Sequence, residues 1–203
     1  WTLVGGLWVA CTAGLLRAGV PGWPLIPAPV RIVLGVLALW LAWLAVVQAR
    51  ILGINFLLSV LTLVWVADIF AYFAGRAFGL RFTRNKLAPS ISPGKSWEGV
   101  WGGLAGVLCL AVAWVAADRY FQADVASFYT RLYSAGWWFL AIAVVFMVAM
   151  SVAGDLVESL IKRSAGVKDS SGLLPGHGGV LDRVDALLPT LPLALMLTRL
   201  ISV

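Results

Sequence analysis

The chain has 203 residues, of which 62% are hydrophobic and only 12% are charged, and its net charge is +6. About a quarter of the residues of a soluble domain are charged, so this composition excludes an ordinary soluble protein and indicates an integral membrane protein. In a membrane protein the positive charge reflects cytoplasmic loops and acidic lipid or phosphate ligands, and it is no sign of nucleic-acid binding. Cys11 and Cys109 lie inside apolar runs, which is typical of small buried side chains and not of a disulfide or a metal pair.

Six apolar segments are long enough to cross a bilayer as helices, which takes about 20 residues each. They cover residues 2–20, 31–47, 52–75, 99–117, 136–163 and 184–200. The proline-rich stretch 21–29 cannot continue a helix and is predicted to be an irregular connection. The stretch 118–135 is predicted to be a short polar connection with aromatic residues at the membrane interface. The sequence therefore predicts an all-α, polytopic membrane protein with about six transmembrane helices.

Lysine and arginine residues divide unevenly between the two sides of this layout. The connections around 17–31, 76–95 and 162–183 share one side and hold eleven of them. The other side holds Arg50, Arg119, Arg131 and Arg199. The positive-inside rule makes the richer side cytoplasmic. The two most polar loops are therefore expected to face the cytoplasm together, where soluble nucleotides are found.

Asp68 lies inside the third apolar segment, about two helical turns before Arg76. A carboxylate within a membrane segment needs a partner or a water-filled cavity. Asp68 is therefore either one half of a structural ion pair or part of the lining of a polar site.

A second polar cluster lies at residues 86–99 and contains a Pro-Gly-Lys-Ser run. A Walker A phosphate loop needs glycine where this chain has Pro89, and it needs a preceding strand, so we exclude that motif. The stretch instead predicts a turn and a helix that begins near Ser96. The free N–H groups of such a helix start suit an anion, together with Lys95 and the hydroxyls of Ser92 and Ser96. A solvated basic loop at the lipid headgroups is the alternative.

A third cluster surrounds the end of the fifth apolar segment. Asp155, Glu158 and Lys162 are spaced i, i+3 and i+7, so they share one helix face. Two such carboxylates at a membrane surface can hold Mg²⁺ while phosphates complete its shell. Asp182 and Asp185 begin the next helix, where acidic residues are also favourable simply because of the helix dipole. Taken together, the carboxylates and basic residues suggest a divalent metal and a polyphosphate.

The loop between these helices is rich in glycine and contains the chain's one histidine, His177. Gly178 and Gly179 allow the backbone to approach a ligand closely. Zinc binding is not expected, because no Cys or second His accompanies His177. A serine nucleophile with a histidine base has no elbow motif to support it. His177 is therefore expected to be a hydrogen-bonding residue that shapes the loop.

The stretch Ser159-x-Ile-Lys-Arg-x4-Lys-Asp-x-Ser-x2-Leu-Pro-x-His-Gly-Gly-Val-x-Asp-Arg-Val-Asp185 resembles, at every fixed position, the signature of the phosphatidate cytidylyltransferase (CDP-diacylglycerol synthase) family. The upstream runs Lys86-Leu-Ala-Pro and Ser92-Pro-Gly-Lys-Ser-Trp-Glu-Gly99 are similar to that family's second block, and the resemblance covers the chain from about Asp68 onward. Two positions depart from the family pattern. Ser96 replaces the usual threonine and keeps the hydroxyl, and Phe70 is bulkier than the small residue expected after Asp68.

The resemblance implies an enzyme that transfers CMP from CTP to phosphatidic acid, giving CDP-diacylglycerol and pyrophosphate for phospholipid synthesis, with Mg²⁺. Such a reaction needs no strong base, because the lipid phosphate is already an anionic nucleophile. A CTP-dependent polyprenol or dolichol kinase is the related alternative, and its hydroxyl acceptor would need a base. An ion or proton transporter is the alternative from another class, and it predicts carboxylates distributed through the bilayer depth. A folded but inactive chain is a further alternative.

The resemblance also implies the site residues. The metal ligands are Asp155 and Asp182, supported by Asp185 and Glu158, and a second cation is left open. The catalytic residues are Asp155, Asp182, Lys168, Asp169 and Arg183. The substrate-binding residues are Ser92, Lys95, Ser96, Glu98, Lys162, Arg163, His177, Gly178, Gly179 and Asp68.

The expected partners are CTP, phosphatidic acid and membrane lipids, without nucleic acid, and a homodimer is left open. The expected location is a bacterial-type inner membrane, with the active site facing the cytoplasm. Residues 1–50 are expected to be a generic N-terminal membrane region, and 51–203 the catalytic membrane domain. The chain begins at Trp1, with neither Met nor a basic segment, so a further N-terminal part is expected.

Overall fold

A computed structural model describes residues 1–176 and 178–201, which fold into helices joined by loops. The helices are α1 (Thr2–Gly22), the 3-10 helix η1 (Trp23–Leu25), α2 (Ala28–Leu52), α3 (Ile54–Phe78), α4 (Trp97–Tyr120), α5 (Phe128–Ser134), α6 (Trp137–Ser164), α7 (Leu181–Val184) and α8 (Leu187–Ile201). Among these described residues, six helical segments are long and apolar enough to cross a membrane. The predicted all-α, polytopic membrane class is therefore confirmed.

The proline-rich connection between the first two spans is more helical than predicted. α1 continues to Gly22 across a break at Gly19, where φ is 66°, and η1 follows it directly. Pro21 lies just after that break, at the start of a new helical turn, where the missing N–H of proline removes no helical hydrogen bond. The stretch 21–29 does separate the two spans as predicted, but only Ile26 and Pro27 lie outside a helix, because these prolines occupy positions at which helices begin.

The connection between α4 and α6 contains a helix that the sequence did not predict. Phe128, Tyr129 and Leu132 of α5 are fully buried, and the Phe128 ring packs edge-on against Phe56 at a centroid distance of 5.9 Å. Ser127 caps the helix, since its hydroxyl accepts a hydrogen bond from the Thr130 N–H at 3.2 Å. The expectation of interfacial aromatic residues in a polar connection is therefore wrong for α5, whose aromatic residues belong to the core.

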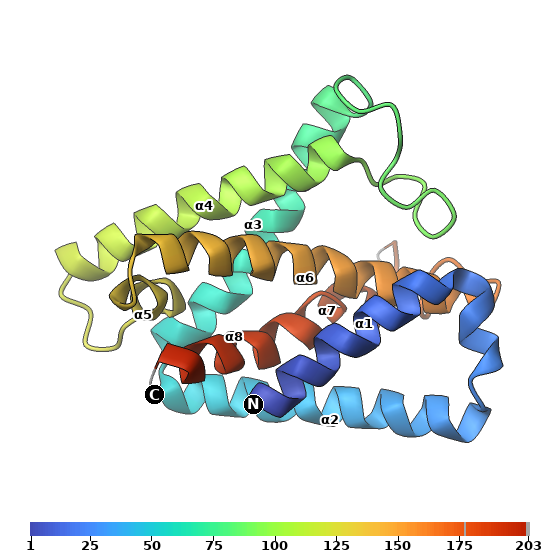
Figure 1. Ribbon diagram of the computed structural model, residues 1–203, viewed down its shortest axis with the longest axis horizontal. Coiled ribbons are helices and arrows are strands. Elements are labelled where there is room, and N and C mark those ends of the chain that lie inside the picture. The colour runs from blue at the N-terminus through green and yellow to red at the C-terminus, as the bar shows by residue number, and fades with distance from the viewer. Residues whose placement is uncertain (177, 202–203) are drawn as a thin grey trace.

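The polar loops converge at one end of the bundle. Figure 1 shows the α3–α4 loop, the α6–α7 loop and the α1–α2 turn at one end, and α5 and the end of α8 at the other. Ile91 of the α3–α4 loop packs with Leu156 and Leu160 of α6, and Trp23 of η1 packs against this small cluster. Alternate connections thus share an end, as the sequence predicts.

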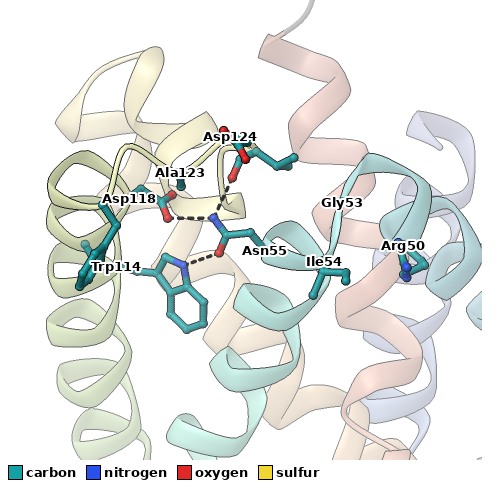
Figure 2. Close-up of a pocket in the computed structure, with 11 residues that line it drawn as sticks. Arg50, Gly53, Ile54, Asn55, Trp114, Asp118, Ala123 and Asp124 are labelled. Carbon is teal, nitrogen blue, oxygen red and sulfur yellow. Dashed lines mark hydrogen bonds between the residues drawn. The ribbon is translucent and has the colours of Figure 1, made fainter.

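The opposite end is held together by a polar network that lines an open hollow of about 620 Å³ (Figure 2). The Asn55 side-chain amide donates to Asp118 Oδ1 at 2.8 Å, and Trp114 Nε1 donates to Asn55 Oδ1 at 2.9 Å. Asp118 Oδ2 accepts from the Ser127 N–H at 3.0 Å and from the Thr130 hydroxyl at 2.6 Å. These groups satisfy one another, so the network joins α3, α4 and α5 as a structural contact.

α3 and α4 approach each other closely along a row of glycines. A Cβ atom at Gly103 would lie 2.8 Å from the carbonyl oxygen of Ala67, and one at Gly99 would lie 3.0 Å from that of Ala71. Small residues of this kind allow transmembrane helices to pack backbone against backbone. The close packing places the first turns of α4 directly against the second half of α3.

Candidate functional site

A cavity of about 450 Å³ lies at the end of the bundle that carries the polar loops. Its walls come from α3, the α3–α4 loop, the start of α4 and α6. The polar side chains that line it are those of Asp68, Tyr72, Arg76, Lys95, Ser96 and Asp155. Much of the remaining lining is glycine and alanine, so the space exists because small residues leave it open.

Lys95 connects two walls of this cavity. Its ammonium group forms an ion pair with Asp155 Oδ2, which joins the α3–α4 loop to α6. The two side chains are 24% and 32% exposed, so the pair is shielded and still accessible from the cavity. Both of these charged groups also act electrostatically on Asp68. The cavity therefore brings together the first, second and third clusters that the sequence identified.

Asp68 lines the cavity, and Arg76 does not pair with it. Arg76 Nη1 instead donates a hydrogen bond to the Tyr72 hydroxyl at 3.0 Å. A structural ion pair between Asp68 and Arg76 is therefore not observed. Asp68 instead lines the polar cavity, which is the other of its two interpretations.

α4 begins where the sequence predicted a helix start. Ser96 is the N-cap residue, and its hydroxyl accepts from the Gly99 N–H at 3.2 Å. Lys95 and Ser96 line the cavity, whereas Ser92 and Glu98 are outside its lining. Glu98 Oε1 instead accepts hydrogen bonds from the N–H and hydroxyl groups of Thr83, at 2.7 and 2.9 Å. In this position Glu98 fastens the start of the α3–α4 loop to α4.

A second charged cluster lies at the end of α6, beside the α6–α7 loop. Lys162 Nζ lies 2.5 Å from Glu158 Oε2 and 2.5 Å from Asp182 Oδ1. The three side chains are only 16%, 7% and 10% exposed, respectively. One lysine thus neutralises two shielded carboxylates from separate elements.

The loop between α6 and α7 wraps around the Asp182 carboxylate. Asp182 Oδ2 accepts from the Ser170 N–H at 2.9 Å, from the Ser170 hydroxyl at 2.8 Å and from the Gly179 N–H at 2.7 Å. A Cβ atom at Gly179 would collide with the Ser170 hydroxyl, so this close approach requires glycine. Asp182 therefore fixes both ends of the loop, and through Lys162 it joins them to α6.

Asp155 lies between the two clusters. The preceding residue, Gly154, packs against the α7–α8 junction, where a Cβ atom would lie 2.6 Å from Pro189 Cγ and 3.2 Å from the Asp185 carbonyl oxygen. This contact brings Asp185 near enough to interact electrostatically with Asp155 and Asp68.

The remaining predicted residues lie around these clusters. Arg163 Nε donates to the Ile91 carbonyl oxygen at 3.4 Å, which ties α6 to the α3–α4 loop. Lys168, Asp169 and Arg183 are exposed, Gly178 has a positive φ of 77°, and His177 lies outside the described residues. The substrate-binding and catalytic roles of all these residues stay predictions.

Tyr72 and Arg76 also line the cavity, although neither was predicted to be a site residue. Their spacing from Asp68 in the sequence could have indicated that they belong to the site. Residues 68, 72 and 76 follow one another at i, i+4 and i+8, which places them on one face of a helix.

A divalent cation fits this set of donors. Among the described residues, no three His, Cys, Asp or Glu side chains gather closely enough to form a metal site by themselves. Glu158 and Asp182 nevertheless converge on a single cation, Lys162, and the second carboxylate oxygen of Glu158, Oε1, is buried without a hydrogen bond. Carboxylate oxygens are what Mg²⁺ prefers, and it commonly takes one or two of them together with substrate phosphates.

Fold and site together define a polytopic helical membrane protein with a cation-lined cavity at one end of its bundle. The chain belongs to the cytidylyltransferase family, whose profile matches residues 3–201.

Three similar proteins show how far this relationship extends. The phosphatidate cytidylyltransferase of Haemophilus influenzae is 51% identical over 140 residues, which are 69% of this chain and 44% of that protein. That of Pseudomonas aeruginosa is 46% identical over 164 residues, 80% of this chain and 55% of that protein. The chloroplastic phosphatidate cytidylyltransferase 5 of Arabidopsis thaliana is 37% identical over 190 residues, 93% of this chain and 39% of that protein. The chain spans roughly half the length of the first two, and the resemblance seen in the sequence is confirmed.

Proposed function

We propose that this protein transfers CMP from CTP to phosphatidic acid, giving CDP-diacylglycerol and pyrophosphate. The observation that carries the proposal is the cavity with Arg76, Lys95 and Asp155 at the end of a membrane bundle, in a chain of the cytidylyltransferase family. Two anionic substrates meet in this reaction, one lipid and one water-soluble. A site with cationic side chains at the end of membrane helices is suited to both.

In the proposed reaction, a phosphate oxygen of phosphatidic acid attacks the α-phosphorus of CTP. The bond between the α-phosphorus and the bridging oxygen breaks, and pyrophosphate leaves with that electron pair. The attacking phosphate is already ionised, so no side chain has to remove a proton. The work of the protein is to hold the two phosphates in line and to neutralise charge. Lys95 and the start of α4, capped by Ser96, supply positive charge and N–H donors on one wall.

We further propose Mg²⁺ as the cofactor, held by Asp155 and Asp182 with Asp185 and Glu158 in support. When bound, the ion supplies charge neutralisation on the triphosphate. Lys162 pairs with Oε2 of Glu158 and Oδ1 of Asp182 in this structure, so these two oxygens would have to release Lys162 in order to bind a metal. The freed ammonium group is then available to a phosphate.

The proposed location is a bacterial-type inner membrane, with the cavity on the cytoplasmic side. Eleven of the fifteen lysine and arginine residues belong to the end that carries the polar loops, and this asymmetry supports that orientation. CTP is found on the same side.

The test uses the full-length protein with CTP labelled at either the α- or the γ-phosphate. With phosphatidic acid and Mg²⁺, we expect α-label in the lipid fraction and γ-label only in pyrophosphate. EDTA is expected to stop the incorporation, and phosphatidylcholine, which lacks the free phosphate, is expected to be no acceptor. If γ-label enters a polyprenol and no α-label enters phosphatidic acid, the protein is a lipid kinase and the proposal is wrong.

A further inference from the structure

Arg76 differs from the other cation of the cavity in its charge environment. Lys95 is neutralised by Asp155, whereas Arg76 forms no ion pair among the residues that the structure describes. Its hydrogen bond to the Tyr72 hydroxyl uses one of the five N–H donors of a guanidinium and fixes the direction of the side chain. An oriented arginine without a counter-ion, in the wall of a cavity, suits two-point binding of a phosphate.

The surroundings of Arg76 distinguish which phosphate it suits. Ile69, Tyr72, Phe73 and Arg76 are spaced i, i+3, i+4 and i+7, so they form one stripe along α3. The first three side chains of this stripe are 51%, 59% and 63% exposed. In a transmembrane helix, such exposed apolar side chains suit contact with lipid chains.

The stripe therefore leads from a lipid-exposed surface to the cavity. Arg76 lies two residues before the end of α3, and Asp68 lies about 12 Å further from that end along the helix axis. Lys95 and Ser96 line the same cavity from the α3–α4 loop and the start of α4, and Lys95 is held by Asp155 of α6. The two cations are thus suited to different substrates, because Arg76 adjoins the exposed apolar stripe of α3 and Lys95 lies on a polar loop.

We propose that Arg76, oriented by Tyr72, binds the phosphate of the lipid substrate, and that this lipid enters along the Ile69–Phe73 stripe of α3. The inference rests on the proposed function and adds a division of labour to it. Arg76 receives the lipid phosphate, and Lys95 and Ser96 receive the nucleotide. Arg76 is then a residue that determines KM for phosphatidic acid and not KM for CTP.

The test is steady-state kinetics of the full-length enzyme in mixed micelles, with CTP and the surface fraction of phosphatidic acid varied independently. Arg76→Gln is expected to raise KM for phosphatidic acid at least tenfold and to change KM for CTP less than twofold. Arg76→Lys keeps the charge without the two-point geometry and is expected to recover part of the loss. Tyr72→Phe removes the orienting hydroxyl and is expected to raise the same KM about threefold. Arg84→Gln is the matched control, because Arg84 is exposed on the same loop end and does not line the cavity.

Each outcome decides the proposal. A rise in KM for CTP, or an unchanged KM for phosphatidic acid in an active and folded Arg76→Gln, would overturn it and leave the proposed function standing. Binding to vesicles with and without phosphatidic acid supplies a readout that needs no turnover. If the wild-type protein makes no CDP-diacylglycerol, the proposed function fails, and loss of phosphatidic acid binding in Arg76→Gln still supports the lipid site. If Arg76→Gln does not fold, Arg76→Lys and Tyr72→Phe carry the same KM comparison.

Discussion

Replacing Lys162 with methionine tests the charged cluster at the end of α6. The substitution keeps most of the aliphatic stem and removes the positive charge that Glu158 and Asp182 share. Removing one partner of a buried ion pair typically destabilises a protein by about 3–5 kcal/mol, because the other partner stays buried and uncompensated. Asp182 keeps its three hydrogen bonds from Ser170 and Gly179, so most of the loss falls on Glu158. We expect the lower end of that range, about 3 kcal/mol.

The assay is thermal unfolding of the full-length protein in detergent, in EDTA and over a titration of Mg²⁺. Lys162→Met is expected to unfold at a lower temperature than wild type in EDTA and to recover as Mg²⁺ is added. A ligand at about 100 times its Kd stabilises the folded state by about 2.7 kcal/mol, which would offset most of the loss. The double variant Lys162→Met/Glu158→Gln is the matched control. It is expected to be more stable than the single variant in EDTA and to respond less to Mg²⁺.

Two results would refute this reasoning. If Lys162→Met is as stable as wild type in EDTA, the two carboxylates do not depend on Lys162 for charge compensation. If the variant is destabilised and Mg²⁺ restores neither it nor wild type, Glu158 and Asp182 are not metal ligands.

Three further substitutions test separate parts of the structure. Gly103→Ala forces a Cβ atom against the Ala67 carbonyl and is expected to destabilise the folded protein by about 1–3 kcal/mol. Gly35→Ala has open space around it and is expected to be neutral or slightly stabilising. If Gly35→Ala unfolds at a lower temperature than Gly103→Ala, the packing argument is wrong. Asp118→Ala leaves partly buried donors without their acceptor and is expected to destabilise the folded protein by about 2–4 kcal/mol in the same assay. KM for CTP is expected to stay unchanged, because Asp118 lies at the other end of the bundle. Asp182→Asn is expected to lower CMP transfer more than 100-fold while circular dichroism shows a folded protein, and retained activity would remove Asp182 from the metal site.

The transmembrane helices were predictable because a bilayer imposes a length and a composition on each span. Every predicted span has its helix, and the ends differ by a few residues because polar and interfacial residues extend the helices beyond the apolar runs. α5 was not predictable in the same way. Its seven residues mix aromatic and polar side chains, and their burial depends on cavities offered by other helices, such as the space beside Phe56.

The convergence of the polar loops was also predictable, since alternate connections of a bundle must share an end. The finer arrangement of the site was not. The sequence placed Lys162 and Glu158 on one helix face, and only the folded loop reveals that Asp182 meets the same lysine. The sequence left open whether Asp68 forms a structural ion pair or lines a polar site, and only the structure shows that Arg76 donates to the Tyr72 hydroxyl.

The two lysines of the site explain how so many carboxylates can be kept at the end of a membrane bundle. Asp155 and Glu158 lie one turn apart on α6, and each has its own lysine, Lys95 from the α3–α4 loop and Lys162 from the next turn. Without substrate, the negative charges of α6 are therefore compensated from within the protein, which avoids the large penalty of unpaired charge in a shielded place. Under the proposed Mg²⁺ site, a nucleotide that binds with the ion would change both partners together, since the carboxylates would gain the metal and the lysines would gain phosphates. Either exchange alone would leave a charged group without a partner. The proposed site therefore predicts that nucleotide and metal bind together more tightly than either binds alone.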